Sequence, residues 1–74
     1  KDPKSTLQEL TQKKYRSLPL YTLSDSSLHK ETNYFEVLCS IDKTNFEVHG
    51  KGNTRKGAEL DAAQNMLELI KKDV

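Results

Sequence analysis

The sequence predicts a two-layer α+β domain, in the order α-β-β-β-α, with two helices packed on one face of a three-stranded antiparallel sheet. Helix-type patterns stand at the two ends of the chain, and alternation of apolar and polar residues marks its middle. Short connections between the predicted strands favour an antiparallel meander. The two helices can then cover the apolar face of that meander, which gives two layers.

The first helix is predicted over residues 3–14. Asp2 can accept hydrogen bonds from backbone N–H groups of the first turn, and Pro3 suits the first helical position. Leu7 and Leu10 form a short apolar stripe along one side of this helix.

The helical pattern stops at Leu18-Pro19, where the chain turns into a first strand. Tyr21 and Leu23 alternate along the chain, as expected for a short strand. Residues 24–33 are polar and rich in turn-forming residues, so we interpret them as a loop.

The second strand has the clearest pattern in the chain. Four apolar residues alternate strictly with their neighbours and share one face: Phe35, Val37, Cys39 and Ile41. After a turn at residues 42–45, Phe46 and Val48 begin a third strand that stops near Gly50. Phe35 and Phe46 are expected to point inward. The opposite face of the sheet is expected to stay in water and to be acidic and polar, with Glu36, Ser40 and Glu47.

The last helix is predicted over residues 55–72, with Thr54 as its N-cap. Its first turn carries Arg55 and Lys56, although the partial positive charge of a helix N-terminus favours acidic side chains. Two cations at this end are explained most simply if a polyanion binds there, and phosphate is the best candidate. Residues at spacings of four allow the helix to lie close to the sheet: Ala58, Ala62 and Met66.

Length and charge restrict the possible functions. The 74 residues, 34% of them apolar and 31% charged, form one small domain over residues 1–74, and a start at Lys1 rather than Met indicates a fragment of a larger protein. The net charge is only +1, but cations gather in residues 11–24 and 51–58, which can form a basic face. No apolar run is long enough to span a membrane. The single cysteine, Cys39, excludes an internal disulfide and fits a reducing compartment.

Several short motifs, taken in their order and spacing, resemble those of double-stranded RNA-binding domains. They are Pro-x-Tyr at residues 19–21, the loop histidine His29, Gly-x-Gly at residues 50–52 and Thr-Arg-Lys-x-Ala at residues 54–58. The opening Asp-Pro-Lys-Ser-Thr-Leu-Gln-Glu of residues 2–9 is similar to the start of the C-terminal RNA-binding domain of bacterial ribonuclease III. The resemblance covers essentially the whole chain.

The resemblance implies that three regions contact duplex RNA. In the first helix, the polar groups of Ser5, Gln8 and Glu9 can hydrogen-bond ribose 2′-OH groups and base edges in the wide minor groove. In the loop after the first strand, His29 is the expected minor-groove contact and Lys30 a phosphate ligand. This loop is about two residues longer than is usual in the family, judged by the spacing from His29 to Phe35, and it lacks the family's proline.

The third implied region surrounds the start of the last helix, where cations can straddle phosphates across the major groove. Glu59 stands where the family usually has a third lysine, although ribonuclease III domains often carry an acid there. The residues of this region are Lys51, Asn53, Thr54, Arg55, Lys56 and Glu59.

The implied function is shape-based binding of about 16 base pairs of duplex RNA. The fragment itself is not expected to be an enzyme, because its acidic residues are scattered and no nucleophile–base pair is visible. The resemblance implies a parent ribonuclease III, a double-strand-specific endonuclease of the cytoplasm that processes ribosomal and other RNAs. Its separate catalytic domain would hold magnesium and form a homodimer. No cofactor and no small-molecule substrate are expected for this chain.

Other classes fit less well. An RNA-recognition motif would display aromatic residues on its open sheet face, and a KH domain needs Gly-x-x-Gly between helices. The Gly-x-x-x-x-Gly spacing of residues 52–57 lacks the following Lys-Ser/Thr of a phosphate loop. His29, His49 and Cys39 lack the spacing of metal ligands. A protein-interaction or dimerisation module of the same fold stays open as the alternative, and it would bind without steep salt dependence.

Overall fold

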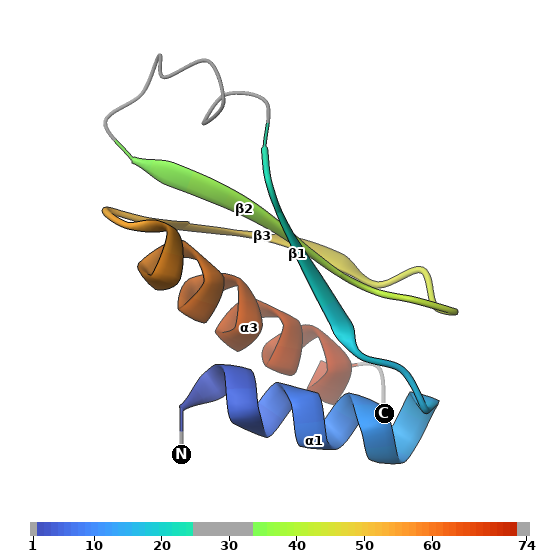
Figure 1. Cartoon of the computed structure of the whole chain (residues 1–74). Helices are drawn as coiled ribbons and strands as arrows, with labels where there is room; N and C mark the ends of the chain where they lie inside the picture. Colours follow the sequence, from blue (N-terminus) through green and yellow to red (C-terminus); the bar gives the residue numbers. More distant parts are fainter. Residues whose placement is uncertain (1, 25–33, 73–74) are drawn as a thin grey trace.

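The computed structural model describes residues 2–24 and 34–72 and has the predicted order of elements. They are α1 (Pro3–Tyr15), β1 (Pro19–Leu23), β2 (Phe35–Ile41), β3 (Glu47–Gly52) and α3 (Arg55–Lys72). The strands form one antiparallel sheet in the order β1-β2-β3. Both helices lie on the same face of this sheet (Figure 1), which confirms the two-layer α+β fold. The predicted loop lies outside the described residues, apart from Ser24.

Both helices begin at the predicted caps. The Asp2 carboxylate accepts a hydrogen bond from the Ser5 N–H at 2.8 Å, and Pro3 occupies the first turn of α1. The Thr54 hydroxyl accepts one from the Gly57 N–H at 2.9 Å. Each cap satisfies a backbone donor that the helix itself leaves free. Neither described helix has the length and apolarity that crossing a bilayer requires.

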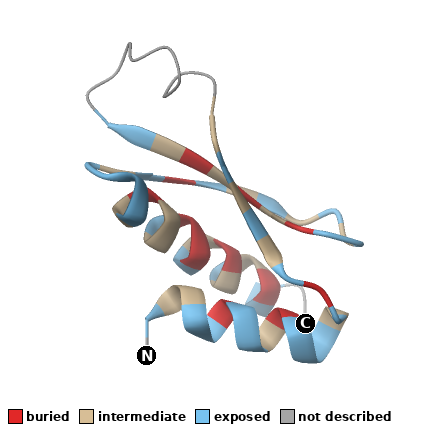
Figure 2. Cartoon of the chain, viewed as in Figure 1, coloured by how far each residue is buried: buried red, intermediate tan, exposed pale blue. Residues whose placement is uncertain are grey.

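The core lies between the sheet and the helices. Val37, Cys39 and Ile41 of β2 are buried on the inner face, as their alternation predicts. Figure 2 shows that buried positions of α3 face the sheet. Burial of a Val- or Leu-sized side chain stabilises a fold by about 1.5–3 kcal/mol. The buried helix residues are Leu7, Thr11, Ala58, Ala62, Ala63, Met66 and Ile70.

Details at the strand ends differ from the sequence predictions. β1 begins at Pro19 itself, which is tolerated because Pro19 is the first residue of an edge strand. β3 begins after Phe46 and continues two residues past Gly50. Phe46 is partly buried and its ring lies 5.8 Å from the ring of Tyr15. By alternation Phe35 lies on the same face as Val37, but it is 39% exposed, because it is the first residue of β2 and stands at the end of the sheet.

The outer sheet face is less polar than predicted. Glu47 is exposed, but Glu36 and Ser40 are half-buried. Leu38, also half-buried, lies between them on the same face, and Leu20, opposite Ser40, is 57% exposed. The alternation of β2 places Leu38 on this face, so the face is a mixture of aliphatic and polar side chains.

Helix α3 packs closely against β3 and also closes its outer edge. An added Cβ at Gly50 would lie 2.2 Å from the Ala62 nitrogen, so only glycine fits this crossing. At the edge, the Asp61 carboxylate accepts a hydrogen bond from the Lys51 N–H at 2.9 Å, and the Asn65 amide donates one to the His49 carbonyl at 2.8 Å. These two backbone groups flank Gly50, and a parallel strand added at this edge would form its hydrogen bonds with the same two groups.

Candidate nucleic-acid interface

The exposed side of α1 carries the predicted minor-groove contacts. Ser5, Gln8 and Glu9 are exposed, whereas Leu7 on the other side of the helix is fully buried. The Ser5 hydroxyl lies 3.5 Å from the Asp2 carboxylate. Because these groups project from the first two turns of one helix, they can face a groove together.

A second group of predicted contacts follows the chain from β3 into α3. The exposed residues of this group are Lys51, Asn53, Thr54, Arg55 and Lys56. The Lys51 ammonium lies 5.2 Å from the centre of the Tyr34 ring, and the Thr54 hydroxyl is engaged in capping α3. The first turn of α3 contains no acidic residue. Its dipole and its side chains therefore add to the same positive potential.

Lys56 differs from Arg55 in its surroundings. The Arg55 Nε donates a hydrogen bond to the Glu59 carboxylate at 3.2 Å, four residues along the helix. Lys56 makes no ion pair with any residue of 2–24 or 34–72. An uncompensated lysine at a helix N-terminus can offer its full charge to a phosphate.

Glu59 is turned toward α1 rather than outward. Its carboxylate accepts a hydrogen bond from the Lys4 ammonium at 2.6 Å, and its side chain is only 15% exposed. The hydrogen bond from Lys4, with a further one from Arg55, holds the pKa of Glu59 below its ordinary value. Lys4 is the residue of this site that sequence reasoning missed, although its spacing of four from Gln8 places both on one side of α1.

Lys4, in the first turn of α1, contacts Glu59 of α3, and Figure 1 shows that both helices begin at the same end of the helical layer. A small cavity of about 130 Å³ lies between α1 and β1 and is lined by Lys4, Gln8, Leu18, Pro19 and Tyr21. The predicted contacts His29 and Lys30 lie outside the described residues.

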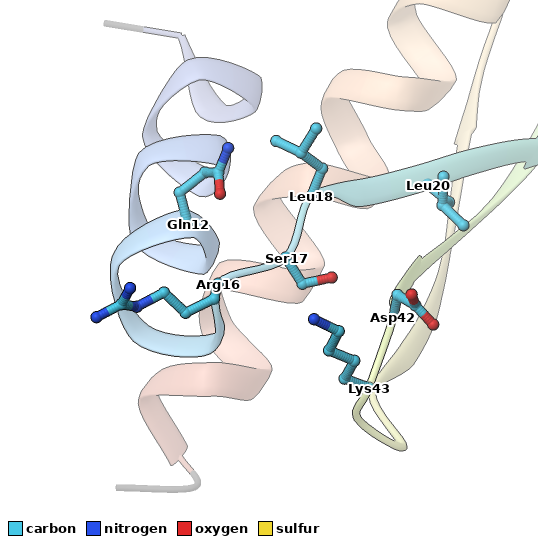
Figure 3. Close-up of a pocket in the computed structure, with 7 residues that line it drawn as sticks. All are labelled: Gln12, Arg16, Ser17, Leu18, Leu20, Asp42 and Lys43. Atoms are coloured by element: carbon cyan, nitrogen blue, oxygen red, sulfur yellow. The ribbon is translucent and has the colours of Figure 1, made fainter.

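A larger open cavity, about 370 Å³, lies away from the predicted interface. Figure 3 shows it between the C-terminal end of α1, the start of β1 and the turn after β2. Arg16 and Lys43, which both have left-handed backbone conformations (φ 57° and 68°), contribute cations to its wall together with Asp42. The remaining lining residues are Gln12, Ser17, Leu18 and Leu20.

Among residues 2–24 and 34–72, the buried polar groups offer no second site. The Tyr21 hydroxyl is buried and has no nitrogen or oxygen partner among the described residues; it lies against the Cys39 thiol. Burial raises the pKa of Tyr21, and it raises the pKa of Cys39 to about 11, so both groups are protonated at neutral pH. Within residues 2–24 and 34–72, no three His, Cys, Asp or Glu side chains gather where they could hold a metal ion.

The chain has an antiparallel sheet with two helices on one face, and exposed cations at the start of the second helix. These features are those of a class of RNA-binding domain, and comparison with known families supports the same class. Residues 3–70 match the family model of the double-stranded RNA binding motif. The chain belongs to this family, which supports double-stranded RNA as its partner.

Among characterised proteins, the chain is similar to bacterial ribonuclease III. It is 45% identical over 70 residues to Ribonuclease 3 of Methylococcus capsulatus, covering 95% of this chain and 30% of that protein. It is 36% identical over 72 residues to Ribonuclease 3 of Aromatoleum aromaticum, covering 97% and 32%. The match to Ribonuclease 3 of Buchnera aphidicola is 42% over 67 residues, covering 90% and 30%. The chain thus spans about a third of the length of these relatives.

Proposed function

We propose that this domain binds double-stranded RNA by recognising the shape of the duplex, and positions it for a ribonuclease III catalytic domain outside this chain. The α1 side chains Ser5, Gln8 and Glu9 would contact a minor groove, and the loop residues His29 and Lys30 a second one. The start of α3 would bind the phosphates between them. Because the major groove of A-form RNA is too narrow for side chains, such binding reads groove spacing and 2′-OH groups rather than base sequence.

The observation that carries this proposal is the start of α3. Arg55 and Lys56 occupy a helix N-terminus that has no acidic residue in its first turn, and Lys56 has no ion-pair partner in the described chain. Without an anionic ligand, acidic side chains at this helix N-terminus would be more favourable than two cations. Their exposure beside the polar face of α1 is explained by a phosphate backbone that spans both.

The similarity to bacterial ribonuclease III supports a role in the parent protein. We infer that the parent is a double-strand-specific endonuclease of the cytoplasm that processes ribosomal and other structured RNAs. Its catalytic domain would carry the magnesium ions and form the homodimer. In this arrangement the present domain contributes affinity and orientation, and the chemistry takes place elsewhere in the protein.

Titration against a blunt RNA duplex of about 20 base pairs, and against the DNA duplex of the same sequence at two salt concentrations, tests the proposal. RNA-selective binding that weakens steeply with salt is expected. Lys56→Ala should weaken binding to both duplexes and reduce the salt slope by about 1. Lys71→Ala, which removes a lysine that is also exposed but lies at the other end of α3, is the matched control.

Gln8→Ala tests the minor-groove contact separately. It should reduce the preference for RNA over DNA and leave the salt slope unchanged, because an amide contact to a 2′-OH releases no counterion. Gln64→Ala on the exposed side of α3 is its control. Binding that neither prefers RNA nor responds to salt would refute the proposal and favour a protein-interaction role.

A further inference from the structure

One carboxylate joins the two helices that carry the predicted RNA contacts. Each oxygen of Glu59 serves a different cation: Oε1 accepts from the Lys4 ammonium at 2.6 Å, and Oε2 accepts from the Arg55 Nε at 3.2 Å. Lys4 lies in α1, whereas Glu59 and Arg55 lie in α3, 55 and 51 residues further along the chain. The Glu59 side chain is 15% exposed, so this carboxylate is shielded from water more than an ordinary surface ion pair.

Lys4 also contacts the sheet. Its ammonium lies 4.9 Å from the centre of the Tyr21 ring, within the range of a cation–π interaction. The bridge of Lys4, Glu59 and Arg55 therefore ties the first turn of α1 both to β1 and to the first turn of α3. These two contacts restrict the Lys4 side chain and thereby favour one spacing between the helix starts.

We propose that Glu59 is a positioning residue for RNA binding, a role that rests on the proposed function. It sets the distance between the α1 contacts, which begin one residue after Lys4, and the cations at the start of α3. A duplex presents its minor groove and the neighbouring phosphates at a spacing set by its A-form geometry. A domain that reads shape needs its two contact sets held at that spacing before the duplex arrives, because ordering them during binding lowers affinity.

Electrostatics alone predicts the opposite effect for this residue. A carboxylate beside phosphate-binding cations repels the phosphates and neutralises part of their attraction. If Glu59 acted only through its charge, its removal would strengthen binding to every nucleic acid. The direction in which RNA affinity changes therefore separates positioning from simple charge compensation.

The decisive variant is Glu59→Gln, with Glu68→Gln as the matched control. Both change one glutamate of α3 to its neutral isostere, and Glu68 is exposed more than two turns from the bridge. Glu59→Gln should lower RNA affinity about fivefold, the size of a typical pairwise coupling, while DNA affinity stays unchanged or rises with the added positive charge. Glu68→Gln should leave the RNA-to-DNA ratio unchanged. RNA affinity of Glu59→Gln that equals or exceeds that of the control would overturn the proposal.

Lys4→Met breaks the same bridge from its other end and keeps the test usable if Glu59→Gln does not fold. It should also lower the RNA-to-DNA ratio, and in the Glu59→Gln background it should add less loss than it causes alone. Full additivity of the two changes would count against a shared bridge. If the unmodified chain shows no preference for RNA, the proposed function fails. If it prefers RNA and Glu59→Gln behaves as Glu68→Gln does, only the positioning role is refuted.

Discussion

The crossing of α3 over β3 leaves room for glycine alone at position 50, and Gly50→Ala tests how rigid that crossing is. An added Cβ would lie 2.2 and 2.6 Å from the Ala62 nitrogen and Cα, and 2.4 Å from the Ala58 carbonyl oxygen. All three are backbone atoms, so no side-chain rotation can relieve the clash. To reach an ordinary contact of 3.4 Å, the helix must withdraw by roughly 1 Å.

That withdrawal would loosen the most tightly packed interface of the domain. Overpacking a core costs about 1–3 kcal/mol, and we expect Gly50→Ala at the upper end, near 3 kcal/mol, because backbone must move. A domain of this length has a free energy of unfolding of about 4–11 kcal/mol. With a urea dependence of about 1 kcal/mol per molar, the unfolding midpoint should fall by about 3 M.

Gly57→Ala is the matched control for the same substitution. Its added Cβ would meet the Thr54 hydroxyl at 3.2 Å, and the nearest atom contributed by the sheet, the Gly52 Cα, lies at 4.0 Å. Helix propensity favours alanine there by about 1 kcal/mol, so its free energy of unfolding should stay within about 1 kcal/mol of the unmodified chain. The reasoning is refuted if Gly50→Ala unfolds in urea within about 1 kcal/mol of the unmodified chain.

Three further predictions concern the caps, the acidic groups and the sheet edge. Thr54→Ala should lower the free energy of unfolding by about 1 kcal/mol through loss of the N-cap, and a thermal melt in which Thr54→Ser shows the same loss would contradict this. The hydrogen bond from the Ser5 N–H lowers the pKa of Asp2 from 3.8, and the hydrogen bond from Lys4 lowers the pKa of Glu59 from 4.5. The two ionised carboxylates therefore stabilise the fold at neutral pH, and this stabilisation is lost as the pH falls below these values. Urea midpoints that stay level or rise between pH 5 and about pH 2 would disprove the linkage. Asp61→Ala combined with Asn65→Ala uncovers the outer edge of β3, and sedimentation should show concentration-dependent self-association, whereas a strictly monomeric double variant would show that another feature protects the edge.

The elements that the sequence predicted well are those whose signals are local. The alternation from Phe35 to Ile41 defined β2 and its buried face, and Thr54 marked the start of α3 to the residue. The 39% exposure of Phe35 was not predicted, because alternation specifies a side of the sheet but not how completely that side is covered at the end of a strand. Nothing in the sequence near Gly50 indicates that the Lys51 N–H and the His49 carbonyl form hydrogen bonds with side chains of α3.

The candidate site shows the same division. Arg55 and Lys56 were predictable from the conflict between their charge and the helix dipole. Lys4 was not, because its partner Glu59 lies 55 residues away and the pair exists only after both helices have docked. The roles of the predicted RNA contacts, including His29 and Lys30, stay predictions.

The thiol of Cys39 provides a built-in reporter of unfolding. It is the one cysteine of the chain, fully buried at the centre of β2, and its pKa is raised to about 11. Alkylating reagents attack the thiolate, so labelling of the native domain must wait for an opening that brings this strand into water. Labelling rates at increasing reagent concentration would therefore measure how often the sheet separates from α3. The same measurement with duplex RNA present would give the stabilisation due to binding, without any introduced probe.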